Sequence, residues 1–189
     1  MILYLHGFRS SPSSFKARLL AQHFAAIGRA EEFICPQLPA SPAEAIFLAQ
    51  HLIDQFRGDR LVLIGSSLGG YYATYLAEQN HCKALLVNPA VKPPRDLEKY
   101  VGVSTAFHSD EPFEFKHAYI DELKQFAIEK ITQPDRYFLI AATGDEVLDW
   151  REMVAHYPMA KQLVIQGSDH GVSEFAEYIE TVMAFCDAE

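Results

Sequence analysis

The stretch Leu61-Val-Leu-Ile-Gly-Ser-Ser-Leu-Gly-Gly70 joins an apolar run directly to a G-x-S-x-G motif, Gly65-Ser-Ser-Leu-Gly69. The run predicts a buried strand, and the motif after a strand is typical of a sharp turn into a helix. Such a turn holds its central serine in a strained conformation at the end of a sheet, with glycines where side chains would clash. The motif therefore makes Ser67 the candidate nucleophile and predicts hydrolytic chemistry.

Strands and helices alternate on both sides of this turn. Strands are predicted at residues 2–5, 33–36, 60–64, 83–87, 137–141 and 162–165. Helices are predicted at 12–27, 42–56, 68–79, 150–157 and 173–185, with N-caps at Ser11, Ser41 and Asp149 for the first, second and fourth. The alternation is typical of a parallel sheet with helices on both faces and reactive groups at the carboxyl ends of its strands.

Residues 89–132 interrupt the alternation. At least one helix is expected there, around 117–130, and many charges surround five aromatic residues: Phe107, Phe113, Phe115, Tyr119 and Phe126. These aromatics either line an acyl pocket or form the apolar underside of a lid packed on the sheet. We expect one domain over residues 1–189, with a lid-like insertion at about 89–132.

Composition excludes several classes of function. The chain has 189 residues, 49% of them hydrophobic, and a net charge of −9. This charge argues against nucleic acid as a partner and gives no general attraction toward anionic substrates or membrane surfaces. Its three cysteines, Cys35, Cys82 and Cys186, lack metal or redox spacing and suggest reduced thiols in the cytoplasm. The apolar start at 1–5 has neither a basic leader nor a cleavage site, and no apolar run is long enough to span a membrane.

A serine nucleophile needs a histidine base and an acid that orients it. On α/β-hydrolase folds the chain order is serine, acid, histidine. Asp145 and Asp149 both follow the fifth predicted strand, and Asp145 is favoured because it comes directly after the strand-end Gly144. Asp149 instead suits a helix N-cap, with Glu152 completing a capping box.

His170 follows the sixth predicted strand and is the histidine that fits this order. His6 is expected to brace the loop after the first strand, His156 lies in a helical pattern, and Asp169 is expected to be a local turn residue. The remaining histidines precede the acid: His23, His51, His81, His108 and His117. The candidate triad is therefore Ser67, Asp145 and His170.

An oxyanion hole needs two backbone N–H groups aimed at the developing charge. One is expected from Leu68, the residue after the nucleophile, and the other from Phe8, in the loop after the first strand. Arg9 and Lys16 lie near this loop in sequence. They either meet an anionic substrate group or are solvated surface cations, and the second interpretation is favoured.

Several motifs together resemble the YqiA-like family of small bacterial esterases, within the α/β-hydrolase superfamily. They are His6-Gly-Phe8, Gly65-Ser-Ser-Leu-Gly-Gly-Tyr-Tyr72, Asn88-Pro-Ala90, Thr143-Gly-Asp-Glu-Val-Leu-Asp149 and Asp169-His170. The resemblance covers nearly the whole chain. It implies a serine esterase with the triad above, activity on acyl thioesters, and a trimmed sheet that lacks the first two strands of the superfamily. Gly171 departs from the larger residue expected in relatives, which should loosen packing beside the base.

We therefore expect a cytoplasmic hydrolase of small-molecule carboxylic esters or acyl thioesters, needing no metal or organic cofactor. Ser67 disfavours dehalogenases and epoxide hydrolases, which use an aspartate nucleophile, and the short insertion leaves little room to select peptides. A non-catalytic binding protein on a hydrolase scaffold is the alternative. Acyl chain length, leaving group and oligomeric state are left open.

Overall fold

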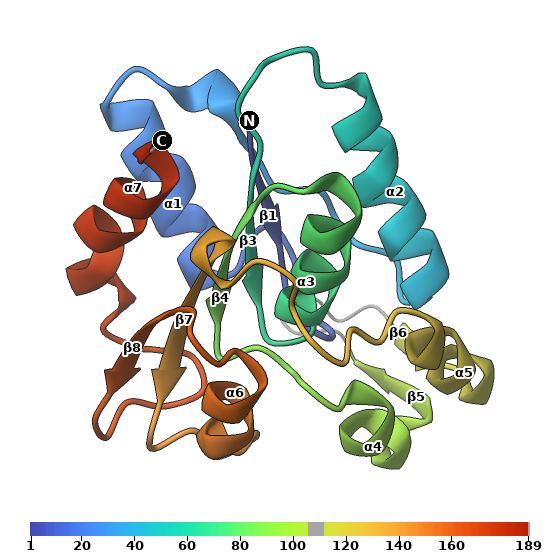
Figure 1. Cartoon of the computed structure of the whole chain (residues 1–189). Helices are drawn as coiled ribbons and strands as arrows, with labels where there is room; N and C mark the ends of the chain where they lie inside the picture. Colours follow the sequence, from blue (N-terminus) through green and yellow to red (C-terminus); the bar gives the residue numbers. More distant parts are fainter. Residues whose placement is uncertain (106–111, 189) are drawn as a thin grey trace.

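The computed structural model of the chain describes residues 1–105 and 112–188 (Figure 1). The described residues form a six-stranded sheet in the order β2-β1-β3-β4-β7-β8, in which every neighbouring pair is parallel. The strands are β1 (Ile2–Leu5), β2 (Phe33–Ile34), β3 (Val62–Ser66), β4 (Lys83–Val87), β7 (Tyr137–Ala142) and β8 (Lys161–Ile165). The parallel sheet predicted from the alternation is confirmed.

The order of the strands reverses at β1. The chain adds β2 on one side of β1 and then returns to add β3 on the other side. In open α/β sheets, such a reversal leaves a crevice beyond the carboxyl ends of the two strands. The loops that follow β1 and β3 therefore border the natural site for a ligand.

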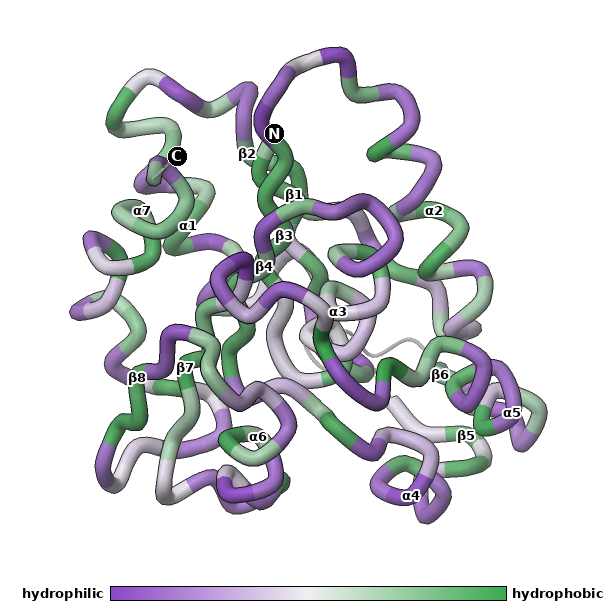
Figure 2. The backbone as a smooth tube through the Cα atoms, viewed as in Figure 1, coloured by the Kyte–Doolittle hydropathy of each residue, from purple (hydrophilic) through white to green (hydrophobic). Residues whose placement is uncertain are grey.

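Helices cover both faces of the sheet (Figure 1). One face carries α1 (Phe15–Ala26) and α7 (Ile179–Asp187), and the other carries α2 (Pro42–Gln55), α3 (Leu68–Asn80), α5 (His117–Gln125) and α6 (Trp150–His156). Side chains alternate along the strands, so Ile2 and Tyr4 pack under α1 while Leu3 and Leu5 pack under α3. Figure 2 accordingly shows hydrophobic residues concentrated in the strands between the helix layers.

The helix starts agree with the sequence patterns at α2 but not at α1. Ser41 caps α2, with its Oγ accepting a hydrogen bond from the Glu44 N–H at 3.2 Å. The predicted N-cap at Ser11 is wrong, because α1 begins at Phe15 after Ser14. Ser11 instead closes a separate turn, in which its carbonyl accepts from the Ser14 N–H at 3.0 Å.

The stretch 89–132 contains more structure than the expected helix. It contains α4 (Pro93–Leu97), an antiparallel pair formed by β5 (Gly102–Thr105) and β6 (Pro112–Phe115), and α5. Single 3-10 turns complete the described structure at Ala30–Glu32, Glu98–Tyr100, Pro134–Arg136 and Phe175–Tyr178, the last of which replaces the predicted start of the final helix. In the described ranges, no helix combines the length and the apolar character needed to cross a membrane.

The aromatic residues of this stretch pack mainly into the core. Phe115 is fully buried, and its ring centroid lies 5.0 Å from that of Phe8 in an edge-on contact. Phe113 meets the same Phe8 ring at 5.2 Å. This packing agrees with the interpretation that they form an apolar underside, whereas Phe107 lies outside the described residues.

Candidate active site

Ser67 lies at the turn between β3 and α3, with φ of 56° and ψ of −121°. A positive φ is unfavourable for a residue with a side chain, so the surrounding structure must hold it. The Ser67 N–H donates to the Val87 carbonyl and the Ala90 N–H donates to the Ser67 carbonyl, both at 3.0 Å. A Cβ on Gly69 would lie 1.9 Å from the Leu5 carbonyl oxygen, so only glycine allows α3 to start this close to β1.

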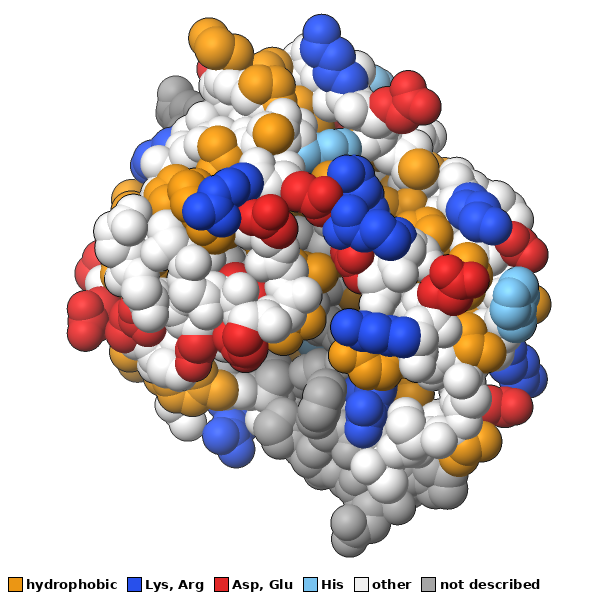
Figure 3. Space-filling model, turned by 90° about the horizontal axis from the view of Figure 1, so that it is seen from below, with side chains coloured by type: hydrophobic (Ala, Val, Ile, Leu, Met, Phe, Trp, Pro, Cys, Tyr) orange, Lys and Arg blue, Asp and Glu red, His pale blue; other side chains and the backbone are white. Residues whose placement is uncertain are grey.

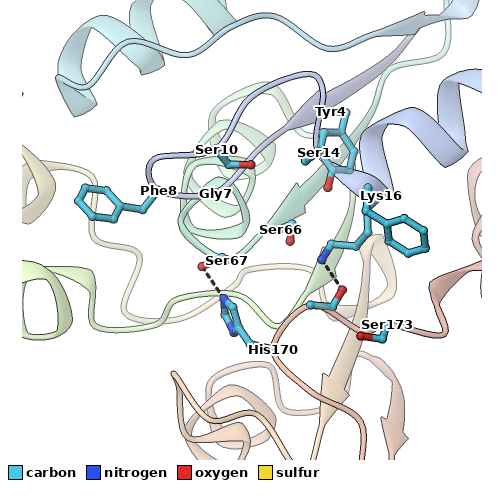
Figure 4. A pocket seen from close by; sticks show the side chains of 12 residues that line it. Tyr4, Gly7, Phe8, Ser10, Ser14, Lys16, Ser66, Ser67, His170 and Ser173 are labelled. Carbon is cyan, nitrogen blue, oxygen red and sulfur yellow. Dashed lines mark hydrogen bonds between the residues drawn. The ribbon is translucent and has the colours of Figure 1, made fainter. Parts of the chain in front are cut away.

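The structure brings Ser67, His170 and Asp145 into one hydrogen-bonded chain. His170 Nε2 lies 3.0 Å from Ser67 Oγ, and His170 Nδ1 lies 2.7 Å from Asp145 Oδ2. A dashed line in Figure 4 marks the first of these contacts. The Asp145 side chain is 0% exposed and that of His170 is 20% exposed. Because an ionised carboxylate can only accept, it holds the proton on Nδ1 and leaves Nε2 free to accept from the serine hydroxyl.

The two aspartates that compete in sequence lie in different environments. Asp145 Oδ1 accepts from the N–H groups of Val147 and Leu148, both at 2.8 Å, which fixes the carboxylate toward His170. Asp149 caps α6 by accepting from the Arg151 N–H at 2.9 Å. The capping box expected with it is wrong in one part, because the Glu152 carboxylate instead binds Arg95 of α4 and Lys92, which precedes that helix.

The backbone around His170 is held by two side chains that the sequence did not single out for this role. The Glu146 carboxylate accepts from the His170 N–H at 3.0 Å. The Asn88 amide donates to the carbonyls of Asp169 and His170 at 3.2 and 2.9 Å, while its Oδ1 accepts from the Ala142 N–H at 2.8 Å. Asn88 is fully buried, so one side chain joins the ends of β4 and β7 to the His170 loop.

The loop after β1 passes directly beside the serine. A Cβ on Gly7 would lie 3.1 Å from the Ser67 Cβ, so the backbone at residue 7 borders the Ser67 side chain. Among the described residues, no backbone hydrogen bond is recorded for the N–H of Phe8 or Leu68. His6 braces this loop, as expected, with Nδ1 3.0 Å from the Gly7 carbonyl and Nε2 accepting from the Leu38 N–H at 3.0 Å.

Burial lowers the pKa of His6, which is therefore neutral near pH 7 and can both donate and accept.

Asp169 is the expected local turn residue: its carboxylate accepts from the N–H and the hydroxyl of Ser173, at 2.9 and 2.5 Å. His156 lies in α6, with its ring packed edge-on against Tyr157. Within the described ranges, no three His, Cys, Asp or Glu side chains come together as a metal site.

Two pockets meet at Ser67 and His170. The first, of about 220 Å³, is lined mainly by apolar side chains with charged groups among them: Phe8, Arg9, Leu68, Ala90, Asp96, Leu97, Lys99, Tyr100, Val147 and Leu148. The second, of about 460 Å³, has apolar surface from Phe8 and Phe15 beside hydroxyl groups and one amine, which come from Tyr4, Ser10, Ser14, Lys16, Ser66 and Ser173. Figure 3 looks onto this edge of the sheet and shows a hollow near its middle, with Lys and Arg side chains beside it.

The two cations near the oxyanion loop are not free surface charges. Arg9 has φ of 57°, and its Nε donates to the Thr105 carbonyl at 2.6 Å. Lys16 is half-buried, and its Nζ donates to the Gly171 carbonyl at 2.6 Å. Lys16 is therefore less solvated than the favoured interpretation of a surface cation expects. At Gly171 itself, a Cβ would meet Asp169 Oδ1 at 3.4 Å, so the position has room for a small side chain.

A model of the family described as Uncharacterised protein family (UPF0227) matches residues 1–187. The chain belongs to this family. It is the YqiA-like family that the sequence motifs resemble.

Solved structures with similar folds are hydrolases and esterases. A putative hydrolase from Agrobacterium vitis S4 matches with a TM-score of 0.77 and 17% identity, over 98% of this chain and 87% of that one. Mouse alpha/beta hydrolase domain-containing protein 10 matches with a TM-score of 0.72 and 16% identity, over 97% of this chain and 89% of that one. Est1E from Butyrivibrio proteoclasticus, with ferulic acid bound, matches with a TM-score of 0.75 and 14% identity, over 100% of this chain and 89% of that one. This UPF0227 chain therefore has the α/β-hydrolase fold.

Proposed function

We propose that the protein is a serine hydrolase that cleaves small-molecule carboxylic esters or acyl thioesters. The observation that carries the proposal is the unbroken hydrogen-bonded chain from Asp145 through His170 to Ser67. It ends at a serine held at positive φ beside a pocket. A structural serine needs neither the strained turn nor a histidine oriented by a buried carboxylate.

In this scheme the Ser67 hydroxyl attacks the acyl carbon while His170 Nε2 takes its proton. Asp145 keeps the imidazole oriented and stabilises the imidazolium that forms. His170 then gives the proton to the leaving alcohol or thiol, and the acyl group remains on Ser67. Water, activated by the same histidine, hydrolyses the acyl-enzyme and restores the serine.

The oxyanion of each tetrahedral intermediate would be held by the N–H groups of Phe8 and Leu68. Leu68 is the first residue of α3, so the positive end of that helix adds to the stabilisation. Donors that are already fixed need no reorganisation during the reaction, which is where most of their effect on rate arises. His6 contributes indirectly because it fixes the carbonyl of Gly7 and with it the loop.

The mainly apolar pocket suits an acyl chain. Part of its wall comes from Ala90, Leu97 and Tyr100, so the 89–132 stretch acts as a lid-like insertion within a single hydrolase domain. The triad itself serves oxygen esters and thioesters equally, and hydrolysis of matched acyl groups would separate them. The fold neighbour Est1E, with its bound ferulic acid, is in keeping with a small organic ester as substrate.

The decisive test is covalent labelling with a fluorescent fluorophosphonate, read by intact mass and peptide mapping. We expect one adduct, on Ser67, in the wild type and none in Ser67→Ala. Ser66→Ala is the matched control, because the neighbouring serine borders the same pocket and should leave the label in place. Ester turnover of Ser67→Ala should fall by about 10³-fold or more, with the far-ultraviolet spectrum unchanged.

The opposite result has a clear meaning. A folded wild type that neither reacts with the probe nor turns over any activated ester would contradict the proposal. The non-catalytic binding protein would then be the better description, with the triad residues retained only as a hydrogen-bonded support for the loops.

A further inference from the structure

Lys16 places a cation in the hydroxyl-lined pocket that borders Ser67. Its side chain is half-buried, and its ammonium faces the same space as the Ser67 hydroxyl (Figure 4). Ser14 and Phe15, at the start of α1, line that pocket too. Because Lys16 lies in the first turn of α1, the positive end of the helix dipole adds to the local positive potential.

The hydrogen bonds of Lys16 leave donor capacity unused. One N–H of the ammonium is donated to the Gly171 carbonyl. Within the described ranges, no carboxylate lies within ion-pair distance of Nζ, although Asp169 and Asp145 are near enough to stabilise the charge. An ammonium has three donors, so further donors are available to an acceptor in the pocket.

Burial lowers the pKa of Lys16 to about 8, because the desolvation of the ammonium outweighs the attraction of the two aspartates. A cation held in a partly desolvated position costs stability unless something compensates it. Binding an anion is one such compensation. At neutral pH the group still carries its charge, so it can serve this purpose.

We infer that Lys16 is a specificity-determining residue that binds an anionic group of the substrate, a carboxylate or a comparable oxyanion, in the hydroxyl-lined pocket. This inference rests on the proposed function and adds the substrate class. The serine hydroxyls at positions 10 and 14, which line the same pocket, supply neutral donors to the same group. The rest of the substrate then occupies the pocket on the other side of Ser67, where apolar side chains lie beside Arg9, Asp96 and Lys99.

Two pairs of matched esters test the inference and distinguish where the anion lies. One pair places the charge on the leaving group: the butyrate ester of para-hydroxybenzoic acid against that of its methyl ester. The other places it on the acyl part: mono-para-nitrophenyl adipate against methyl para-nitrophenyl adipate. We expect the wild type to favour the anionic member of one pair by about 10-fold or more in kcat/KM, the range for a hydrogen bond between charged groups.

Lys16→Met should remove that preference and Lys16→Arg should keep part of it. Lys161→Met is the matched control, since Lys161 begins β8 and lies at the opposite edge of the sheet from Ser67. Ser67-dependent hydrolysis without preference in either pair would overturn the inference. A Lys16→Met variant in which kcat/KM falls equally for both members of the preferred pair would overturn it too, because Lys16 would then only anchor Gly171. Failure of the proposed function looks different, since no ester would be turned over at all.

Discussion

Ser67, the proposed nucleophile, is held in its conformation by its neighbours. The strained φ is tolerated because the main chain is bonded on both sides to the end of β4. A side chain at Gly7 would press against the serine, and one at Gly69 would collide with β1. The two glycines therefore allow the loop after β1 to approach Ser67 and the start of α3 to approach β1.

The pH dependence of substrate choice follows from Lys16. Burial lowers its pKa to about 8, against the opposing effect of Asp169 and Asp145. The ammonium is charged below that pH and neutral above it, so the preference for the anionic ester should be constant near pH 6–7, halve near pH 8 and vanish by about pH 9.5.

That ratio should be measured for the matched pair in which the wild type shows a preference, from pH 6 to 9.5 at constant ionic strength. In Lys16→Arg the ratio should stay flat over this range, because guanidinium does not lose its proton. A wild-type ratio that does not change across pH 8 would contradict the assignment of the anion to Lys16.

At the level of elements, Asn88 connects the strand ends to the candidate base. Its φ of 42° is one that asparagine tolerates better than most residues, and its buried amide makes three hydrogen bonds to β7 and the His170 loop. Asn88→Ala should destabilise the protein by about 2–4 kcal/mol, because buried backbone groups lose their partners. It should also lower kcat more than it raises KM.

Urea unfolding and steady-state kinetics check both parts of this prediction. Asn80→Ala is the matched control, because Asn80 also hydrogen-bonds through its side chain but lies at the far end of α3. It should cost stability without a selective loss of kcat. If the two variants have the same kinetic effect, the bonds from Asn88 to the loop do not position His170.

Sequence patterns predicted elements well where the signal is local. The α2 start was found because Ser41, Pro42 and Glu44 act within one turn. The α1 start was missed because Ser11 satisfies a turn of its own, and the β5–β6 pair was missed because β5 is almost wholly exposed and shows no burial pattern. The role of Asn88 depends on groups 54 and 82 residues away, which no local pattern reports.

For the whole molecule, the parallel topology explains why candidate site residues could be named at all. Ser67, Asp145 and His170 follow β3, β7 and β8, and parallel strands bring such positions to one edge of the sheet. The two pockets could not be predicted, because their walls combine the start of α1 with the insertion and the loops. The contact of Lys16 could not be predicted for the same reason, because its ammonium donates to a carbonyl 155 residues further along the chain.

Thiol chemistry gives a test that involves the whole structure. Burial raises the pKa of Cys82 to about 11 and those of Cys35 and Cys186 to about 12. At pH 8 only about one thiol in a thousand or fewer is then a thiolate, which is the reactive form. Native protein should therefore resist iodoacetamide and keep its esterase activity, whereas protein in urea should gain three adducts by mass. Rapid loss of activity with one native adduct would show that a cysteine, rather than Ser67, supports the chemistry.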